Sequence, residues 1–282
     1  MNYVRPAGTA ELLSALQEDG AAIICGGTDI LVKLRHGLVA PKTLVDVSRL
    51  DDLRGIEDVD GEIHIGAATN ENEILKHPLV IERLPLLCDV LRRLAAVEIR
   101  SRGSLGGNLV NASPAADSAV PLLLHEARLR LVGPEGDRWL PVDEFILAPG
   151  KTALEKGEFV RTIVVPDPPA GGRCFFHKVG RRRALIIAIA SLGMLIGLTG
   201  ERVDWVRLAG GSVAPTPLRL RSAEQILLGG SLTEARIRDA VQAASRSVSP
   251  IDDVRATASY RRQVIGDLLE RFLRQALNDK ER

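Results

Sequence analysis

Two glycine doublets beside hydrogen-bond donors are the feature that most limits what this chain can fold into. They lie in CGGTDILVK (25–33) and RGSLGGN (102–108), in distant parts of the sequence. Glycine tolerates positive φ and lets backbone amides approach a ligand, so consecutive amides can surround an anion. Thr28, Ser104 and Asn108 add side-chain donors. The two loops therefore indicate a clamp for a diphosphate, with tight turns alone as the alternative.

Two common phosphate-binding motifs are excluded by spacing. No two glycines are separated by a single residue, so the GxGxxG motif of a Rossmann fold is absent. FILAPGKT (145–152) ends like a P-loop, but Phe145 stands where the first glycine is required. The glycine loops must therefore belong to another nucleotide-binding arrangement.

Composition argues against a nucleic-acid partner. The net charge is +1 and aromatic residues make up 3% of the chain, so neither a basic surface nor a set of stacking platforms is indicated. The apolar run at 184–198 is shorter than the ~20 residues that span a bilayer as a helix. We expect no membrane span.

Cysteine and histidine spacing indicates neither a metal site nor a disulfide framework. Cys25, Cys88 and Cys174 are widely separated and form no CxxC pair. The histidines show no metal-ligand spacing either; they are His36, His64, His77, His125 and His177. The N-terminus lacks the apolar core of a secretory signal, so the sequence favours the cytoplasm.

Helix and strand patterns alternate in the first part of the chain. We expect Thr9 to cap a helix over AELLSALQE, and a long helix from about Ile81 to Val97 before the second glycine loop. Strands are expected at 21–25, 43–48, 62–68, 127–133 and 159–166. We predict one α+β domain over residues 1–172, whose two lobes each contribute one glycine loop.

PDPPAGG (166–172) is rich in proline and glycine and is the expected linker to a C-terminal domain over residues 173–282. Strand-like runs lie at 174–180, 184–198 and 202–214, and three helical patterns follow them. Ser231 and Glu234 stand at capping-box spacing, and the last helix is expected over about 257–277. We predict a three-stranded antiparallel sheet backed by helices.

Five motifs, in their order and spacing, resemble the FAD-binding medium subunit of molybdenum hydroxylases. That family includes the flavoprotein subunits of xanthine dehydrogenase and of aerobic carbon monoxide dehydrogenase. The motifs are IICGGTDI (23–30), IGAAT (65–69), RGSLGGNLVNASPAAD (102–117), PGKTALEKGE (149–158) and FFHKVGRRRALIIA (175–188). Each motif is weak alone, but together they are specific and the resemblance covers the whole chain.

The resemblance implies noncovalent FAD in a fold of the vanillyl-alcohol-oxidase and p-cresol-methylhydroxylase type, with its diphosphate between the two glycine loops. In the first loop it implies Ile23, Ile24, Cys25, Gly26, Gly27, Thr28, Asp29 and Ile30 at the cofactor. In the second loop it implies Ser104, Leu105, Gly106, Gly107 and Asn108. We expect Gly106→Asp to place a negative side chain at the phosphates and to abolish FAD binding while the fold is retained.

Four further positions match the family's cofactor contacts. Asp117 suits ribose or ribityl hydroxyls, because a carboxylate accepts hydrogen bonds and repels phosphate. Lys178 and Arg182 would bring positive charge to the flavin and stabilise its reduced form, and Val160 would pack against the ring. The alternatives are a turn or cap residue for Asp117, a solvated run of cations for Lys178 and Arg182, and an ordinary strand residue for Val160.

The chain departs from the xanthine-type members at two places. Leu94 stands where those members place an aromatic residue against the ring, and Leu185 and Ile186 replace an acidic pair. By the resemblance, both positions border the exposed face of the flavin. The two changes therefore leave open which molecule accepts electrons from it.

The resemblance implies an oxidoreductase subunit that transfers electrons through FAD. Because this chain lacks cluster ligands, a small partner subunit would carry [2Fe-2S] clusters and a large one molybdopterin, in a dimer of heterotrimers. The acceptor would be NAD, dioxygen or a quinone, and no catalytic acid or base is assigned. The alternatives are a free-standing flavin reductase or oxidase, and a structural adaptor without flavin.

Overall fold

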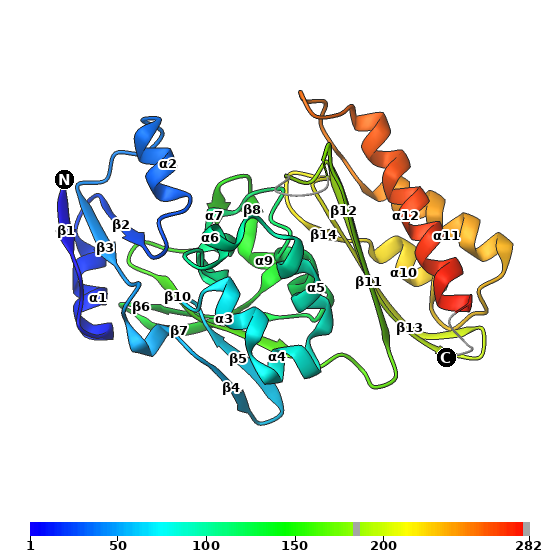
Figure 1. Cartoon of the computed structure of the whole chain (residues 1–282), viewed down its shortest axis with the longest axis horizontal. Coiled ribbons are helices and arrows are strands. Elements are labelled where there is room, and N and C mark those ends of the chain that lie inside the picture. The colour runs from blue at the N-terminus through cyan, green and yellow to red at the C-terminus, as the bar shows by residue number, and fades with distance from the viewer. Residues whose placement is uncertain (183–186, 279–282) are drawn as a thin grey trace. The chain divides into compact units, whose positions relative to one another are not determined.

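The computed structural model of the chain describes residues 1–182 and 187–278. Contacts divide it into two compact units whose segments alternate along the sequence (Figure 1). The first unit comprises Met1–Leu84, Ala95–Ala112 and Glu126–Pro166. The second comprises Pro85–Leu94, Ser113–His125 and Asp167–Arg282. Two short segments from the first 172 residues thus group with the C-terminal part of the chain. The predicted division into domains at residue 172 stays a prediction.

A three-stranded parallel sheet in the first unit carries the first glycine loop. Its order is β1 (Asn2–Val4), β3 (Thr43–Asp46), β2 (Ala21–Ile24). The central strand is buried along its whole length, and α1 (Thr9–Gln17) packs on the sheet through Leu12 and Leu16. The first loop leaves the carboxyl end of β2 and leads into α2 (Ile30–Arg35).

A five-stranded antiparallel sheet forms the rest of the first unit's framework. Its order is β4 (Ile56–Val59), β5 (Glu62–Gly66), β10 (Phe159–Pro166), β6 (Arg128–Gly133), β7 (Gly136–Pro141). The strands expected at 62–68, 127–133 and 159–166 are its three central ones. Smaller elements complete the unit: η1 (Asp51–Leu53), α9 (Val142–Phe145), β8 (Ile146–Ala148) and β9 (Lys151–Thr152).

The single helix expected from Ile81 to Val97 is wrong. The chain there forms three helices, α4 (Pro78–Arg83), α5 (Pro85–Arg93) and α6 (Val97–Arg100). Pro85 has no amide hydrogen to continue α4, and Ala95 has a φ of 41°, which ends the second helix. The helical spacing of the leucines continues across both helix breaks, so apolar periodicity alone does not predict where the helices end.

Both predicted helix caps are displaced. The N-cap of α1 is Gly8, and the hydroxyl of Thr9 instead donates to Asp52 Oδ2 at 3.0 Å. The N-cap of α11 (Glu234–Ser247) is Thr233, whose Oγ1 accepts from the Arg236 amide at 3.2 Å, and not Ser231. In both cases the element has the predicted type but a different first residue.

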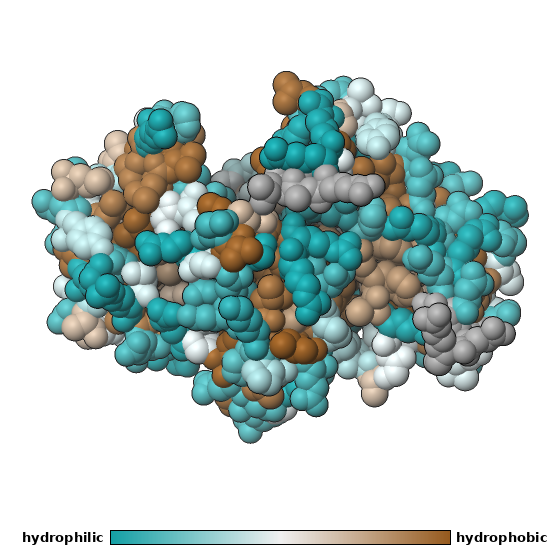
Figure 2. Space-filling view, viewed as in Figure 1, coloured by the Kyte–Doolittle hydropathy of each residue, from teal (hydrophilic) through white to brown (hydrophobic). Residues whose placement is uncertain are grey.

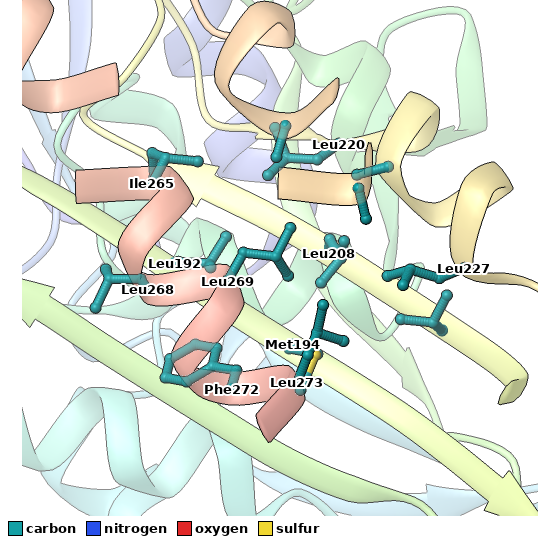
Figure 3. Packing of buried hydrophobic residues seen from close by; sticks show 14 of the residues in the cluster. Leu192, Met194, Leu208, Leu220, Leu227, Ile265, Leu268, Leu269, Phe272 and Leu273 are labelled. Carbon is teal, nitrogen blue, oxygen red and sulfur yellow. The ribbon is translucent and has the colours of Figure 1, made fainter. Parts of the chain in front are cut away.

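The second unit contains the antiparallel sheet expected for the C-terminal part. Its three long strands are β11 (Arg173–Val179), β12 (Ala190–Thr199) and β13 (Arg202–Gly211), followed by a short fourth, β14 (Leu218–Arg219). The segment expected to form a strand from residue 184 forms one from Ala190, and residues 184–186 lie outside the described chain. Figure 3 shows Leu192, Met194 and Leu208 of the sheet packed against α12 (Ala258–Asn278). Two shorter helices, α10 (Arg221–Leu227) and α11, complete this core.

The opposite face of that sheet packs on α8 (Ala119–Leu124). A Cβ added at Gly193 of β12 would lie 2.8 Å from side-chain atoms of both Val120 and Leu124. Only glycine therefore allows the helix to approach the sheet this closely. This contact places the residues just before α8 against the end of β11.

Exposed apolar side chains gather over α2, at the upper left of Figure 2. Leu31 and Val32 are 51% and 52% exposed, and no residue of this helix is buried. Its start is held by a polar contact, because Asn111 Nδ2 donates to Asp29 Oδ1 at 2.9 Å. Among the described residues, none of the helices combines the length and hydropathy needed to cross a bilayer.

Candidate functional site

The two glycine loops lie against each other in the first unit. A Cβ added at Gly26 would lie only 1.8 Å from the carbonyl oxygen of Arg102, at the start of the second loop. Burial raises the pKa of the Cys25 thiol, and the side chain of Ser104 in the second loop opposes this rise. The absence of a side chain at Gly26 is therefore what lets the two backbones meet.

The first loop presents a run of unengaged backbone donors. Gly27 has a φ of 75°, and the helical bonds that follow begin with the Leu31 amide to the Gly27 carbonyl. Within residues 1–182 and 187–278, no acceptor pairs with the amides of Gly27, Thr28, Asp29 or Ile30. Four successive N–H groups at a turn into a helix form a cradle suited to an anion.

The second loop differs, because the amides of residues 105–108 are engaged inside the chain. The Leu105 amide donates to Thr69 O at 3.3 Å, and the Gly106 amide to Ala67 O at 3.0 Å. The amides of Gly107 and Asn108 donate to the side chain and the carbonyl of Ser104 as α7 (Leu105–Asn111) begins. This loop therefore supports the first loop and offers side chains, not a second row of free amides.

The expectation for Gly106→Asp is corrected by this packing. A Cβ at Gly106 would lie 2.6 Å from both the Cβ and the carbonyl oxygen of Ala67. The new side chain would strike the backbone after β5 and would not reach a bound phosphate. Such a variant disrupts the loop itself, so retention of the fold is not expected.

A buried carboxyl that the sequence did not single out lies beside both loops. Glu71, the first residue of α3 (Glu71–Lys76), is 2% exposed, and its Oε1 accepts from Asn108 Nδ2 at 3.3 Å. Burial raises the pKa of Glu71 to about 7 from an ordinary value of 4.5, with a further contribution from Asp29. In the sequence TNENE this residue resembles any acid in the first turn of an exposed helix.

The second unit holds Asp117 and Lys178 as a buried ion pair. Lys178 Nζ lies 2.5 Å from Asp117 Oδ2 and also donates to the Arg93 carbonyl at 3.1 Å. Asp117 Oδ1 is buried and has no partner within the described chain, and burial raises the pKa of Asp117 against the opposing effect of Lys178. One buried carboxyl oxygen thus has no hydrogen-bond partner within the described chain.

The other predicted cofactor positions are dispersed. Val160 is 5% exposed on β10, next to an irregularity in the pairing with β6. Arg182 is exposed in a bend after β11, and Leu94 is buried after α5. Leu185 and Ile186 lie outside the described residues. The roles of these residues at the cofactor stay predictions.

Metal-ligating side chains are not clustered in the part of the chain that the structure describes. It contains no group of three or more His, Cys, Asp or Glu residues that could hold a metal ion. The chemistry suggested by the geometry is anion binding by the first loop and hydroxyl binding by Asp117.

Family comparisons identify the molecule. Residues 1–168 match the family described as "FAD binding domain in molybdopterin dehydrogenase", and residues 175–276 match the "CO dehydrogenase flavoprotein C-terminal domain". The chain belongs to the FAD-binding subunit family of molybdenum hydroxylases. It is thus a flavoprotein subunit of an oxidoreductase, with FAD as its cofactor, as the resemblance in the sequence predicted.

Relatives in this family match over nearly their whole length. The carbon monoxide dehydrogenase medium chain of Hydrogenophaga pseudoflava is 32% identical over 97% of this chain and 96% of its own. The xanthine dehydrogenase FAD-binding subunit of Escherichia coli O157:H7 is 30% identical over 98% and 96%. Quinoline 2-oxidoreductase from Pseudomonas putida 86 superposes with a TM-score of 0.93 at 26% identity, over 99% of this chain and 97% of that one. These matches confirm the predicted fold class.

The first loop of this FAD-binding subunit can be tested by closing the gap at Gly26. We expect Gly26→Ala to push the two loops apart, to lower the free energy of unfolding by about 1–3 kcal/mol, and to abolish FAD binding. Gly8→Ala is the control for FAD binding, since a Cβ there meets nothing within 4 Å and Gly8, the N-cap of α1, lies outside both loops. Thermal melting and FAD titration of both variants measure the effect. Normal FAD affinity in Gly26→Ala would contradict the contact described.

The raised pKa of Glu71 predicts a pH-dependent stability difference in the FAD-free chain. In the unfolded chain this carboxyl ionises from pH 4.5, whereas in the folded chain it resists ionisation up to about 7. Its burial therefore costs nothing at low pH and on the order of 3 kcal/mol above pH 7. We expect Glu71→Gln to raise the melting temperature above about pH 7 and to leave it unchanged near pH 4.

The control for this measurement is Glu73→Gln, on the same helix. Glu73 is exposed and pairs with Arg54 at 2.5 Å. Its replacement should not stabilise the chain at high pH. A Glu71→Gln variant that melts like the unsubstituted chain throughout would show that Glu71 titrates normally.

Proposed function

We propose that this chain is the electron-transferring FAD subunit of a molybdenum hydroxylase complex. It receives electrons from the [2Fe-2S] clusters of a small partner subunit and passes them to NAD, dioxygen or a quinone. The substrate is hydroxylated on a large molybdopterin subunit, and the complex is a dimer of such heterotrimers in the cytoplasm. The observation that carries the proposal is the run of four unengaged amides at residues 27–30, in a chain of the FAD-binding family.

The first loop binds the diphosphate of FAD in this proposal. Its four amides supply donors without any cost of breaking existing hydrogen bonds, and the hydroxyl of Thr28 adds another. The second loop holds the first in place through its contact with Gly26. It also contributes the side chains of Ser104 and Asn108 as hydrogen-bond donors. Hydrogen bonds from several neutral donors suit a diphosphate even though the chain's net charge is only +1.

Asp117 binds a ribose or ribityl hydroxyl through its unpartnered Oδ1. Lys178 fixes the carboxylate through Oδ2, at 2.5 Å, and both side chains are buried. Because this lysine is balanced by Asp117, the pair adds no net charge, and its role is to hold the acceptor oxygen in position. Arg182 remains a proposed source of positive charge near the flavin ring, and Val160 of an apolar contact with it.

Bound FAD supplies redox chemistry in which electrons are accepted singly or in pairs, and so can join one-electron clusters to a two-electron acceptor. The chain needs partners to provide those clusters. Its cysteines are Cys25, Cys88 and Cys174, which are free and form no ligand set. The relatives bear names such as medium chain and FAD-binding subunit, which fits a part of a larger enzyme.

Purification of a tagged chain from its native cells tests the proposal. We expect FAD at about one per chain, together with iron and molybdenum that co-purify on the partner subunits. The measurements are the visible spectrum, metal analysis and the mass of the complex. Metals without flavin in the tagged chain would contradict the assignment of FAD to this subunit.

Two other results would replace the proposal by its alternatives. Flavin without iron or molybdenum, together with turnover by the chain alone, would indicate a free-standing reductase or oxidase. A colourless chain that added FAD does not reconstitute would indicate a structural adaptor.

A further inference from the structure

The carboxyl group of Glu71 lies between the two glycine loops. Its Oε2 is 3.5 Å from the position that a Cβ on Gly103 would take, and Thr28 Oγ1 is 3.6 Å from the same position. Its backbone amide donates to the Gly103 carbonyl at 3.1 Å. Glu71 therefore contacts the second loop through both its backbone and its side chain, and Thr28 Oγ1 of the first loop lies near the same point at Gly103 as its Oε2.

Charged neighbours leave this carboxyl without a direct counter-ion. Asp29, at the N-cap of α2, disfavours its ionised form, and Arg100, on α6, favours it. The Arg100 guanidinium is engaged with Asn72 Oδ1 at 3.3 Å and with Ala95 O at 3.0 Å. Arg100 is the basic side chain that acts on Glu71, and no ion pair joins the two in the described part of the chain. The group that faces it most closely is the neutral amide of Asn108.

We propose that Glu71 is a positioning residue of the FAD site that takes up a proton when the diphosphate binds to the first loop. The inference rests on the proposed function, since it requires the diphosphate at residues 27–30. A diphosphate there adds negative charge to the loop that already carries Asp29. Both negative charges disfavour the ionised form of the Glu71 carboxyl. The protonated carboxyl still accepts from Asn108 Nδ2 through one oxygen and gains an O–H donor on the other.

Proton balance follows from this exchange. The chain without FAD is a mixture of both forms near neutral pH, because burial raises the pKa of Glu71 to about 7. Binding FAD draws one proton from solvent onto the fraction that is ionised, and no covalent bond changes. Above that pH the dissociation constant for FAD rises, up to tenfold per pH unit, until the carboxyl also ionises in the bound state.

Titration of the full chain with FAD between about pH 6 and pH 9 tests the inference. Glu71→Gln removes the ionisation but keeps an oxygen that can accept from Asn108. Glu73→Gln is the matched control, because Glu73 lies on the same helix, is exposed, and pairs with Arg54 at 2.5 Å. Calorimetry in two buffers of different ionisation enthalpy counts the protons taken up by the unsubstituted chain and requires no variant.

We expect the dissociation constant of the unsubstituted chain and of Glu73→Gln to rise at least about tenfold across this range. Glu71→Gln should show no such rise and should bind FAD more tightly than the unsubstituted chain at about pH 9. Proton uptake should approach one per FAD above neutral pH.

An equal pH dependence in Glu71→Gln, or binding by the unsubstituted chain without proton uptake, would overturn the role of Glu71 alone. Failure of the unsubstituted chain to bind FAD at any pH would overturn the proposed function together with it. If Glu71→Gln does not fold, the calorimetric proton count decides: uptake supports the inference and its absence overturns it.

Discussion

The close approach of Gly26 to the carbonyl oxygen of Arg102 is the contact on which the cofactor site depends. A side chain at Gly26 would begin 1.8 Å from that oxygen, so the two loops can meet only at a residue without one. The contact joins a loop from the parallel sheet to a loop that is held by residues after β5. The contact thereby links the parallel sheet and the antiparallel sheet of the first unit beside the unengaged amides of residues 27–30.

The two loops have unequal roles, although their sequences look alike. The first keeps four successive amides unengaged, which suits an anion, while the second uses the amides of Leu105 and Gly106 to bind the chain after β5. Glycines in the second loop serve packing, as the 2.6 Å separation between a Cβ at Gly106 and Ala67 shows. Binding donors and structural support are thus divided between loops, where a Rossmann fold combines both in one turn.

Sequence could predict what local signals determine. The α+β class, the first loop after a short strand and the long terminal helix follow from periodicity and glycine placement, whereas the FAD-binding type of fold was implied by the family resemblance. Glu71 was missed because its burial comes from the second loop packing back on it, some thirty positions later. The engaged amides of Gly106 and Leu105 depend on Ala67 and Thr69 in the same way. The helix break at Ala95 has no proline or glycine to announce it, only a φ of 41°.

The central claim is that the amides of residues 27–30 hold the diphosphate of FAD. The most direct measurement is an experimental structure of the FAD-loaded chain at a resolution that locates phosphate oxygens. The account predicts diphosphate oxygens within about 2.7–3.2 Å of the amide nitrogens of Gly27 and Thr28. A diphosphate bound elsewhere, with those amides facing solvent or another part of the chain, would contradict it.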